Sequence, residues 1–229
     1  MTRFDRKAFD RFLIDNRVVG FFDKPVTLKS GRQSQWYVNW RTVAGDVFLL
    51  DRLSDFLIDF VSDFNLSPDA FYGVPEGASK LGIVTTFKWA KAQKNYAVGS
   101  HPMPMGRGRV KEHGSSKDRF FVGEPRGNIV VIEDVTTTGG SLITTLDHLA
   151  QVDVHILAAI GLTNRMEKRD DGKSVAEAIS ERGVQYHSLS DATEFLPEAC
   201  RAFKPGEKIV SSIEEEFRQY GVKPLKLPV

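Results

Sequence analysis

Residues 130–142, VVIEDVTTTGGSL, join two adjacent acids to six consecutive hydroxyl-bearing or glycine residues. Hydroxyl donors, a backbone freed by Gly139 and Gly140, and the unpaired N–H groups of a following helix together suit a phosphate dianion. Glu133 and Asp134 would repel a phosphate and suit hydroxyl donors, such as the diol of a ribose. The string therefore indicates a ribose 5-phosphate site. The alternative, a capped helix beside solvated acids, accounts for each residue singly but not for the whole string.

The length, apolar fraction and net charge of the chain limit the classes of protein to which it can belong. The chain has 229 residues, 41% of them apolar, which fits one large domain spanning residues 1–229. Its 31 basic and 30 acidic residues give a net charge of +1. This balance gives no reason to expect a nucleic-acid or membrane partner, so an anion site must be local. Neither G-x-x-x-x-G-K-[ST] nor a strand-linked G-x-G-x-x-G is present.

Cysteine usage and the N-terminus bear on the compartment. Cys200 is the single cysteine, so an internal disulfide is impossible and a reducing compartment is the natural interpretation. The first 20 residues are charged throughout and lack the apolar block of a signal peptide. We therefore expect a cytoplasmic protein. The histidines form no ligand-spaced cluster, so no dedicated protein metal site is predicted.

Alternating apolar patterns predict an α/β fold with a mainly parallel sheet. Ligands of such sheets bind beyond the carboxyl ends of the strands, where Glu133 and Asp134 would lie. The long polar segment 101–127 has no clear periodicity, which is typical of a functional lid or a disordered loop. Helices are expected at about 4–16, at 47–64 with Asp46 as the cap, from the glycine-containing turn after residue 74 to about residue 91, and at 140–150, 173–182 and 207–221. Strands are expected within 26–40, where two flank a Ser-Gly turn, and at 70–74, 96–99, 128–134, 154–164 and 184–189.

VVIEDVTTTGGS resembles the phosphoribosyl-diphosphate (PRPP) signature of the type I phosphoribosyltransferases. The resemblance implies a Rossmann-like core, a small hood built mainly from residues 1–45, and a flexible catalytic loop at about 101–127. It also implies that the ribose hydroxyls lie on Glu133 and Asp134. The 5-phosphate would lie on the loop that follows, with Val135, Thr136, Thr137, Thr138, Gly139, Gly140 and Ser141 all binding PRPP.

The segment LKSGRQSQWYVNWR, residues 28–41, is similar to the N-terminal segment of one branch, the orotate phosphoribosyltransferases. The match implies that Lys29 approaches both PRPP and orotate, and that Tyr37 and Val38 flank the flat pyrimidine, with Thr137 also on the base side. Gln35 replaces a usual proline, and Val38 stands where some members carry an aromatic residue.

GRGRVKEHG, residues 106–114, resembles the mobile loop of the same family. Arg107, Lys111 and His113 match its basic cluster, and Arg109 can supply the charge that Gly108 lacks. By resemblance these four bind PRPP, and Lys111, Arg107 and His113 are catalytic together with Asp134. Cations on a flexible loop can close over a diphosphate and neutralise its developing charge. The alternative is an ordinary solvated basic loop.

Two further stretches extend the resemblance, which covers about residues 20–195. Arg165, in LTNRMEKRDDG, matches the arginine that clamps the orotate carboxylate, a task suited to a planar fork. By residue type alone it would be a surface arginine. Glu76 and Gly77 lie at the family's diphosphate turn, where some members have an aromatic residue and a lysine. Lys80, one helical turn later, could compensate for the missing charge.

The resemblance implies Mg²⁺-dependent transfer of a 5-phosphoribosyl group from PRPP to orotate in pyrimidine biosynthesis, by a glycosyltransferase of the pentosyltransferase class. Mg²⁺ would be held mainly by PRPP and water. Family members are homodimers whose loop reaches the neighbouring site, so a homodimer is expected. Two alternatives stay open: a phosphoribosyltransferase acting on another base, and a PRPP-binding regulatory protein of the same fold.

Overall fold

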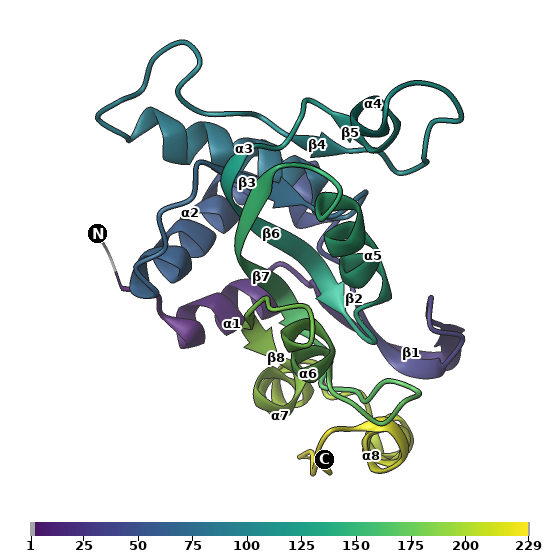
Figure 1. The fold of residues 1–229 in the computed structure, drawn as a ribbon. Helices are drawn as coiled ribbons and strands as arrows, with labels where there is room; N and C mark the ends of the chain where they lie inside the picture. The colour runs from purple at the N-terminus through teal and green to yellow at the C-terminus, as the bar shows by residue number, and fades with distance from the viewer. Residues whose placement is uncertain (1–2, 229) are drawn as a thin grey trace.

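A computed structural model describes residues 3–228, apart from the side chains of 116 and 117, and confirms the α/β class. Four parallel strands in the order β3-β6-β7-β8 form the central sheet, and helices lie on both of its faces (Figure 1). Two antiparallel pairs, β1-β2 and β4-β5, lie outside that sheet.

The strands and helices follow one another along the chain with the alternation that the sequence predicts. The strands are β1 (Val19–Thr27), β2 (Gln33–Val38), β3 (Ala70–Gly73), β4 (Met105–Gly106), β5 (Phe121–Val122), β6 (Gly127–Thr136), β7 (Val154–Asn164) and β8 (Tyr186–Asp191). The helices are α1 (Arg6–Asp15), the 3-10 turn η1 (Val43–Gly45), α2 (Val47–Asp63), α3 (Ser79–Lys91), α4 (Ser116–Phe120), α5 (Gly140–Leu149), α6 (Val175–Ser180), α7 (Ala192–Phe203) and α8 (Glu207–Tyr220).

The central sheet is buried on both faces because successive strand residues point to opposite sides. In β6, Val130 and Ile132 join the core shared with α1, α2, α3, α7 and α8, while Ile129 and Val131 join the core beneath α5 and α6. All four side chains are fully buried. Strand β6 is thereby fixed from both sides, and its carboxyl end, which carries the acid pair, is held in place.

The β1–β2 hairpin carries the segment that includes Lys29. Gly31 closes its turn at φ 83°, a left-handed conformation that favours glycine. Gln35, at the position where a proline was expected by resemblance, donates to the carbonyls of Phe22 and Asp23 at 3.1 and 2.9 Å. Because proline has no side-chain donor, the hydrogen bonds from Gln35 in β2 to β1 are an additional link between the two strands of this hairpin. The hairpin packs on α8, whereas α1, also within residues 1–45, packs on β8 and α7.

Helix α3 lies unusually close to β3. Gly82 allows this approach, because a Cβ at that position would lie 2.5 Å from the backbone nitrogen of Gly73. Backbone atoms cannot move aside as a flexible side chain can. The helix thereby positions the turn 75–77 that precedes it, next to the acid pair.

Gly82→Ala should therefore lower the free energy of unfolding by about 1–3 kcal/mol through overpacking. Gly45→Ala is the matched control, because a Cβ at Gly45 meets no atom within 4 Å. Urea denaturation followed by circular dichroism measures both. Equal stability of the two variants would contradict the close packing of α3 on β3.

Two expectations need correction. Residues 96–99 are turns rather than a strand, since Tyr96 and Val98 are exposed and Gly99 has φ 81°. The segment 101–127 is not wholly irregular, because it contains the β4–β5 pair and the short helix α4.

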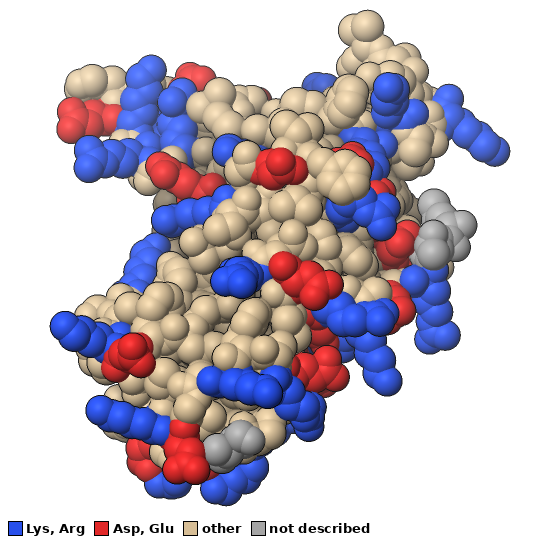
Figure 2. All heavy atoms as spheres, turned by 180° about the vertical axis from the view of Figure 1, so that it is seen from behind, with Lys and Arg blue, Asp and Glu red and all other residues tan. Residues whose placement is uncertain are grey.

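The charged side chains show no segregation on the face in Figure 2, where Lys and Arg lie interspersed with Asp and Glu. In the described part of the chain, no helix combines the length and apolar character needed to cross a membrane.

Candidate active site

The acid pair lies at the carboxyl end of β6, as predicted. Glu133 is paired in register with Gly161 of β7, and the parallel strands β3 and β7 flank β6 on its two sides. This is the edge where open α/β sheets bind their ligands. The chain then turns through Thr137 and Thr138 directly into α5.

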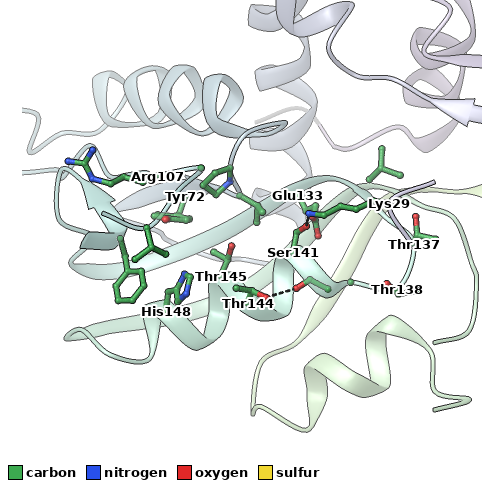
Figure 3. Close-up of a pocket in the computed structure, with 18 of the residues that line it drawn as sticks. Lys29, Tyr72, Arg107, Glu133, Thr137, Thr138, Ser141, Thr144, Thr145 and His148 are labelled. Carbon is green, nitrogen blue, oxygen red and sulfur yellow. Dashed lines mark hydrogen bonds between the residues drawn. The ribbon is translucent and has the colours of Figure 1, made fainter. Parts of the chain in front are cut away.

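The N-terminus of α5 is open. Gly139 is its N-cap residue, with φ 70°, and makes no side-chain capping bond. The alternative interpretation, in which Thr138 or Ser141 serves as the cap, is therefore not what the structure has. Lys29 Nζ instead donates to Ser141 Oγ at 2.6 Å, which brings a cation from the hairpin to the mouth of the helix (Figure 3). Free N–H groups beside an ammonium form an anion site.

A cavity of about 560 Å³ lies beside this helix end. It extends from Lys29 and the loop along α5 to Arg107 of the long loop (Figure 3). Of the residues predicted to bind PRPP, those that line it are Lys29, Arg107, Glu133, Val135, Thr137, Thr138, Gly139, Gly140 and Ser141.

Thr136 is one predicted PRPP residue whose side chain points elsewhere. It is fully buried, and its Oγ1 lies 2.5 Å from the hydroxyl of Tyr186 and 3.4 Å from the carbonyl oxygen of Thr163. As the last residue of β6 it follows the alternation of the strand into the interior. Thr136 therefore ties the loop to the core, and the residues after it face the cavity.

Glu133 is buried, only 6% exposed, and its Oε2 has no hydrogen-bond partner among the described residues. Burial and the neighbouring Asp134 together raise the pKa of Glu133 to about 8, although Lys29 opposes the shift. A carboxyl group that is neutral at pH 7 can donate one hydrogen bond as well as accept others. Because Oε2 has no partner among the described residues and Glu133 lines the cavity, the group is suited to a ligand hydroxyl.

Asp134 is less enclosed than Glu133, and burial raises its pKa while Arg41 and Lys29 lower it. Its carboxylate lies against the turn 75–77. A Cβ on Gly77 would come within 2.1 Å of Asp134 Oδ2, so only glycine leaves room there. The predicted diphosphate turn and the predicted ribose carboxylate are thus in direct contact.

A second cavity, of about 230 Å³, lies on the other side of the acid pair. Glu133, Lys29 and Ser141 line both cavities, so the two meet at the helix mouth. The turn residues Glu76 and Gly77 also line it. All five residues predicted to bind the base are in its lining, namely Lys29, Tyr37, Val38, Thr137 and Arg165.

The guanidinium of Arg165 is already engaged within the protein. It is 1% exposed and donates to Glu167 Oε1 and Glu216 Oε1 at 2.7 Å each. It also donates to Ser34 Oγ at 3.1 Å and, at 3.5 Å, to the carbonyl of Trp36, over whose ring it stacks. Of the five N–H groups of an arginine, four are thus used, and two of the acceptors are carboxylates. The sequence interpretation did not include these contacts.

The neighbours of Arg165 extend this network. Glu167 also binds Arg32 at 2.8 Å, and Arg32 stacks over Tyr220 of α8. Burial raises the pKa of Glu216 to about 7, although Arg165 acts in the opposite direction. Two arginines and two glutamates thus join the hairpin, the segment after β7, and α8, a helix that lies outside the family resemblance.

The long loop is only partly brought to the cavities. Arg107 lines the larger cavity and its Nε donates to the carbonyl of Asp118 at 3.0 Å. Arg109, Lys111 and His113 are exposed and line neither cavity. The structure therefore leaves three of the four predicted loop cations away from the acid pair.

Two of the departures from the family pattern, Glu76 and Gly108, lie side by side. A Cβ on Gly108 would come within 2.3 Å of Glu76 Oε1, so the carboxylate fills the space of a side chain at position 108. Lys80 does not compensate within the cavities, because its Nζ donates to the carbonyl of Ala44 at 3.2 Å and it lines neither of them.

Several lining residues were missed by the sequence analysis. Thr144, Thr145 and His148 follow the motif on one side of α5, and His148 stacks on Phe120 with ring centroids 4.1 Å apart. Their positions three, four and seven residues beyond Ser141, on one face of a helix, were the available signal. Tyr72 lines the same cavity from β3, and nothing in the local pattern distinguished it from a core residue.

Metal-binding side chains are sparse. In the part of the chain that the structure describes, no three His, Cys, Asp or Glu side chains are grouped so that they could hold a metal ion. Asp134 offers a carboxylate of the kind that suits a hard cation at the smaller cavity, whereas Glu133 is neutral at pH 7.

Comparisons with known proteins find relatives of this chain both by sequence and by fold. No family model matches the chain. An orotate phosphoribosyltransferase of Bradyrhizobium is 31% identical over 173 residues, which cover 75% of this chain and 88% of that protein. Among solved structures, the orotate phosphoribosyltransferase of Francisella tularensis has a TM-score of 0.66 at 21% identity, over 93% of this chain and 99% of that one. The Mycobacterium tuberculosis enzyme, solved in complex with PRPP, has a TM-score of 0.56 at 18% identity, over 83% and 98%.

Proposed function

The chain belongs to the orotate phosphoribosyltransferase family of pentosyltransferases, and from this premise we propose that it transfers the 5-phosphoribosyl group of PRPP to orotate. The C1–oxygen bond to the diphosphate breaks, a bond from C1 to the pyrimidine nitrogen forms, and the proton of that nitrogen passes to the departing diphosphate. Orotidine 5′-monophosphate and diphosphate then leave. The observation that carries the proposal is the uncapped end of α5 beside an acid pair, with Lys29 bonded to Ser141.

The ribose 5-phosphate would lie where the two cavities meet. The open N–H groups of α5 and the hydroxyls of Thr137, Thr138 and Ser141 receive the 5-phosphate. Glu133, neutral at pH 7, donates to one ribose hydroxyl, and Asp134 accepts from another. During transfer, positive charge develops on the ribose ring, and the carboxylate of Asp134 stabilises it.

The base would lie in the smaller cavity, against Tyr37 and Val38, with Lys29 and Thr137 at its edge. Arg165 keeps one N–H group for which the described residues provide no acceptor, and it would direct that group at the orotate. The solved complex of the Mycobacterium tuberculosis relative with PRPP supports the first substrate, and the names of the relatives support the second.

A Mg²⁺ ion fits these residues only as a companion of the substrate. The described residues offer no three-ligand cluster, so PRPP oxygens and water would hold the ion, with Asp134 beside them. When bound, Mg²⁺ supplies positive charge to the departing diphosphate. Arg107, Arg109, Lys111 and His113 then add charge from the protein when the loop closes.

We further propose a cytoplasmic homodimer that acts in pyrimidine biosynthesis. Val47, Phe48 and Phe87 leave apolar side chains exposed on the neighbouring helices α2 and α3, as expected of a surface that a second copy covers. Arg109, Lys111 and His113, which line neither cavity of their own chain, would complete the site of the other copy. The lone buried cysteine suits a reducing compartment.

Orotate absorbance in the presence of PRPP and Mg²⁺ tests the reaction, with adenine, hypoxanthine and uracil run in parallel. Absorbance should fall for orotate alone, and Lys111→Ala should reduce the rate by about 10²-fold or more, as loss of a transition-state cation does. Lys94→Ala removes an exposed lysine that lines neither cavity and is the control.

Two other outcomes would overturn the proposal. Turnover of another base instead of orotate would assign a different phosphoribosyltransferase. Tight PRPP binding without turnover of any base would indicate a regulatory protein of the same fold.

A further inference from the structure

The smaller cavity has three cations in its lining, Lys29, Arg41 and Arg165. Lys29 is bonded to Ser141 at the phosphate end, and Arg165 is neutralised by Glu167 and Glu216. Arg41 is different, because its side chain is exposed and no hydrogen bond or ion pair from its guanidinium is found within residues 3–228. A free guanidinium at the edge of a ligand cavity has donors to offer to an anion.

The backbone that carries Arg41 is held firmly. Trp40 on one side is 1% exposed and donates to Thr163 Oγ1 at 3.0 Å, and Val43 on the other side is fully buried. Asn39 Oδ1 accepts from the backbone N–H of Arg41 at 3.2 Å. The guanidinium of Arg41 is therefore available to a ligand while the backbone that carries it is fixed. Such an arrangement preorganises a binding residue.

The neighbours of Arg41 in the cavity indicate which anion it meets. Arg41 acts electrostatically on Asp134, the carboxylate in contact with the turn 75–77. That turn carries no cation, and Glu76 adds a negative charge to it. A diphosphate lying there would have the bare backbone of Gly77 on one side and would lack a fixed protein cation on the other, unless Arg41 supplies it.

We propose that Arg41 binds the diphosphate of PRPP and holds it against the turn 75–77, which makes it a substrate-positioning cation in addition to those of the mobile loop. The proposal rests on the function proposed above. A planar guanidinium can donate two parallel hydrogen bonds to phosphate oxygens. Unlike Lys111, Arg41 lies at the cavity before any loop movement, so it can hold the diphosphate in the open state.

The test is binding of four compounds to the full-length protein and to Arg41→Gln by calorimetry. These are PRPP, inorganic pyrophosphate with Mg²⁺, ribose 5-phosphate and orotidine 5′-monophosphate. We expect the dissociation constants of PRPP and pyrophosphate to rise about tenfold or more, and those of the two compounds without diphosphate to stay within about twofold. Arg41→Lys should recover part of the loss, since it restores the charge but not the fork.

Arg52→Gln is the matched control, because Arg52 is exposed on α2 and, among the described residues, is paired with Asp55 of the same helix alone, at 3.6 Å. It should leave all four constants unchanged. The proposal is wrong if Arg41→Gln binds pyrophosphate as the wild type does. It is also wrong if orotidine 5′-monophosphate is weakened as much as PRPP, since Arg41 would then read the carboxylate of the base.

Failure of the proposed function has a different signature. The wild-type protein itself would then bind neither PRPP nor pyrophosphate, or would bind them without turning over orotate. An equal loss of ribose 5-phosphate binding in Arg41→Gln would indicate a general change in the site and would also contradict the proposal. Thermal unfolding of Arg41→Gln at the wild-type temperature confirms that the variant is folded.

Discussion

Replacing Glu216 with alanine should lower the free energy of unfolding by about 3–5 kcal/mol at pH 8, where the carboxyl group is ionised. Glu216 is 7% exposed and accepts from Arg165 at 2.7 Å and from Ser34 at 2.9 Å. Without it, the guanidinium of Arg165 keeps its buried position but has lost one of its two balancing carboxylates. An incompletely compensated buried charge is among the most destabilising consequences of a single substitution.

Glu215→Ala is the control for this prediction. Its side chain is exposed, it belongs to the same helix, and its ion pair with Arg218 lies at the surface. Removing a surface pair should change stability by less than about 1 kcal/mol. Urea denaturation of both variants at pH 8 measures the difference. Similar stabilities would mean that the network around Arg165 is not what fastens α8 to the hairpin.

Glu133→Gln should stabilise the protein at alkaline pH while impairing catalysis. The folded state holds the Glu133 proton up to about pH 8, whereas an unfolded glutamate releases it near its ordinary pKa of 4.5. Between these values the folded state binds more protons, so the stability of the wild type falls as pH rises from about 4.5 to 8. Glutamine is neutral throughout and escapes this loss, so the gain above pH 8 should be on the order of 3–5 kcal/mol.

Denaturation at pH 5 and pH 9 measures this difference. The variant and the wild type should be close in stability at pH 5 and clearly separated at pH 9. Asp153→Asn removes an exposed carboxylate beyond α5 and should change stability by at most about 0.5 kcal/mol at either pH. A constant difference between Glu133→Gln and the wild type would show that burial does not perturb the proton equilibrium of Glu133.

The sequence predicted most elements that sit in the core. Asp46 accepts from the backbone N–H of Leu49 and begins α2 where the pattern placed the start, and β6 and β7 lie where the apolar runs indicated. Residues 96–99 show the limit of such patterns. The string YAVG has strand-like composition, but a strand needs a neighbour to pair with, and this segment lies exposed at the surface.

Parts of the candidate site could also be predicted from the sequence, and other parts could not. The helix mouth and the acid pair are local in sequence, so the order of residues 133–141 already indicated their arrangement. The setting of Arg165 could not be foreseen, because Glu216 reaches it from 51 positions away on a helix outside the motif. Thr136 belonged to the motif, but its position in β6 directed its side chain to Tyr186 in the interior rather than to the cavity.

The contact between Glu76 and Gly108 has a mechanical consequence. Gly106 also lies tightly against two residues that line the larger cavity, since a Cβ on Gly106 would meet the hydroxyl of Tyr72 at 2.2 Å and Pro75 at 2.5 Å. The long loop 101–127 therefore packs against the turn 75–77 of its own chain at positions 106 and 108. A side chain at position 108 would therefore require the carboxylate of Glu76 to move aside, whereas Glu76 itself can become smaller without affecting Gly108. A loop movement that keeps these contacts would be confined to the residues from Arg109 onward.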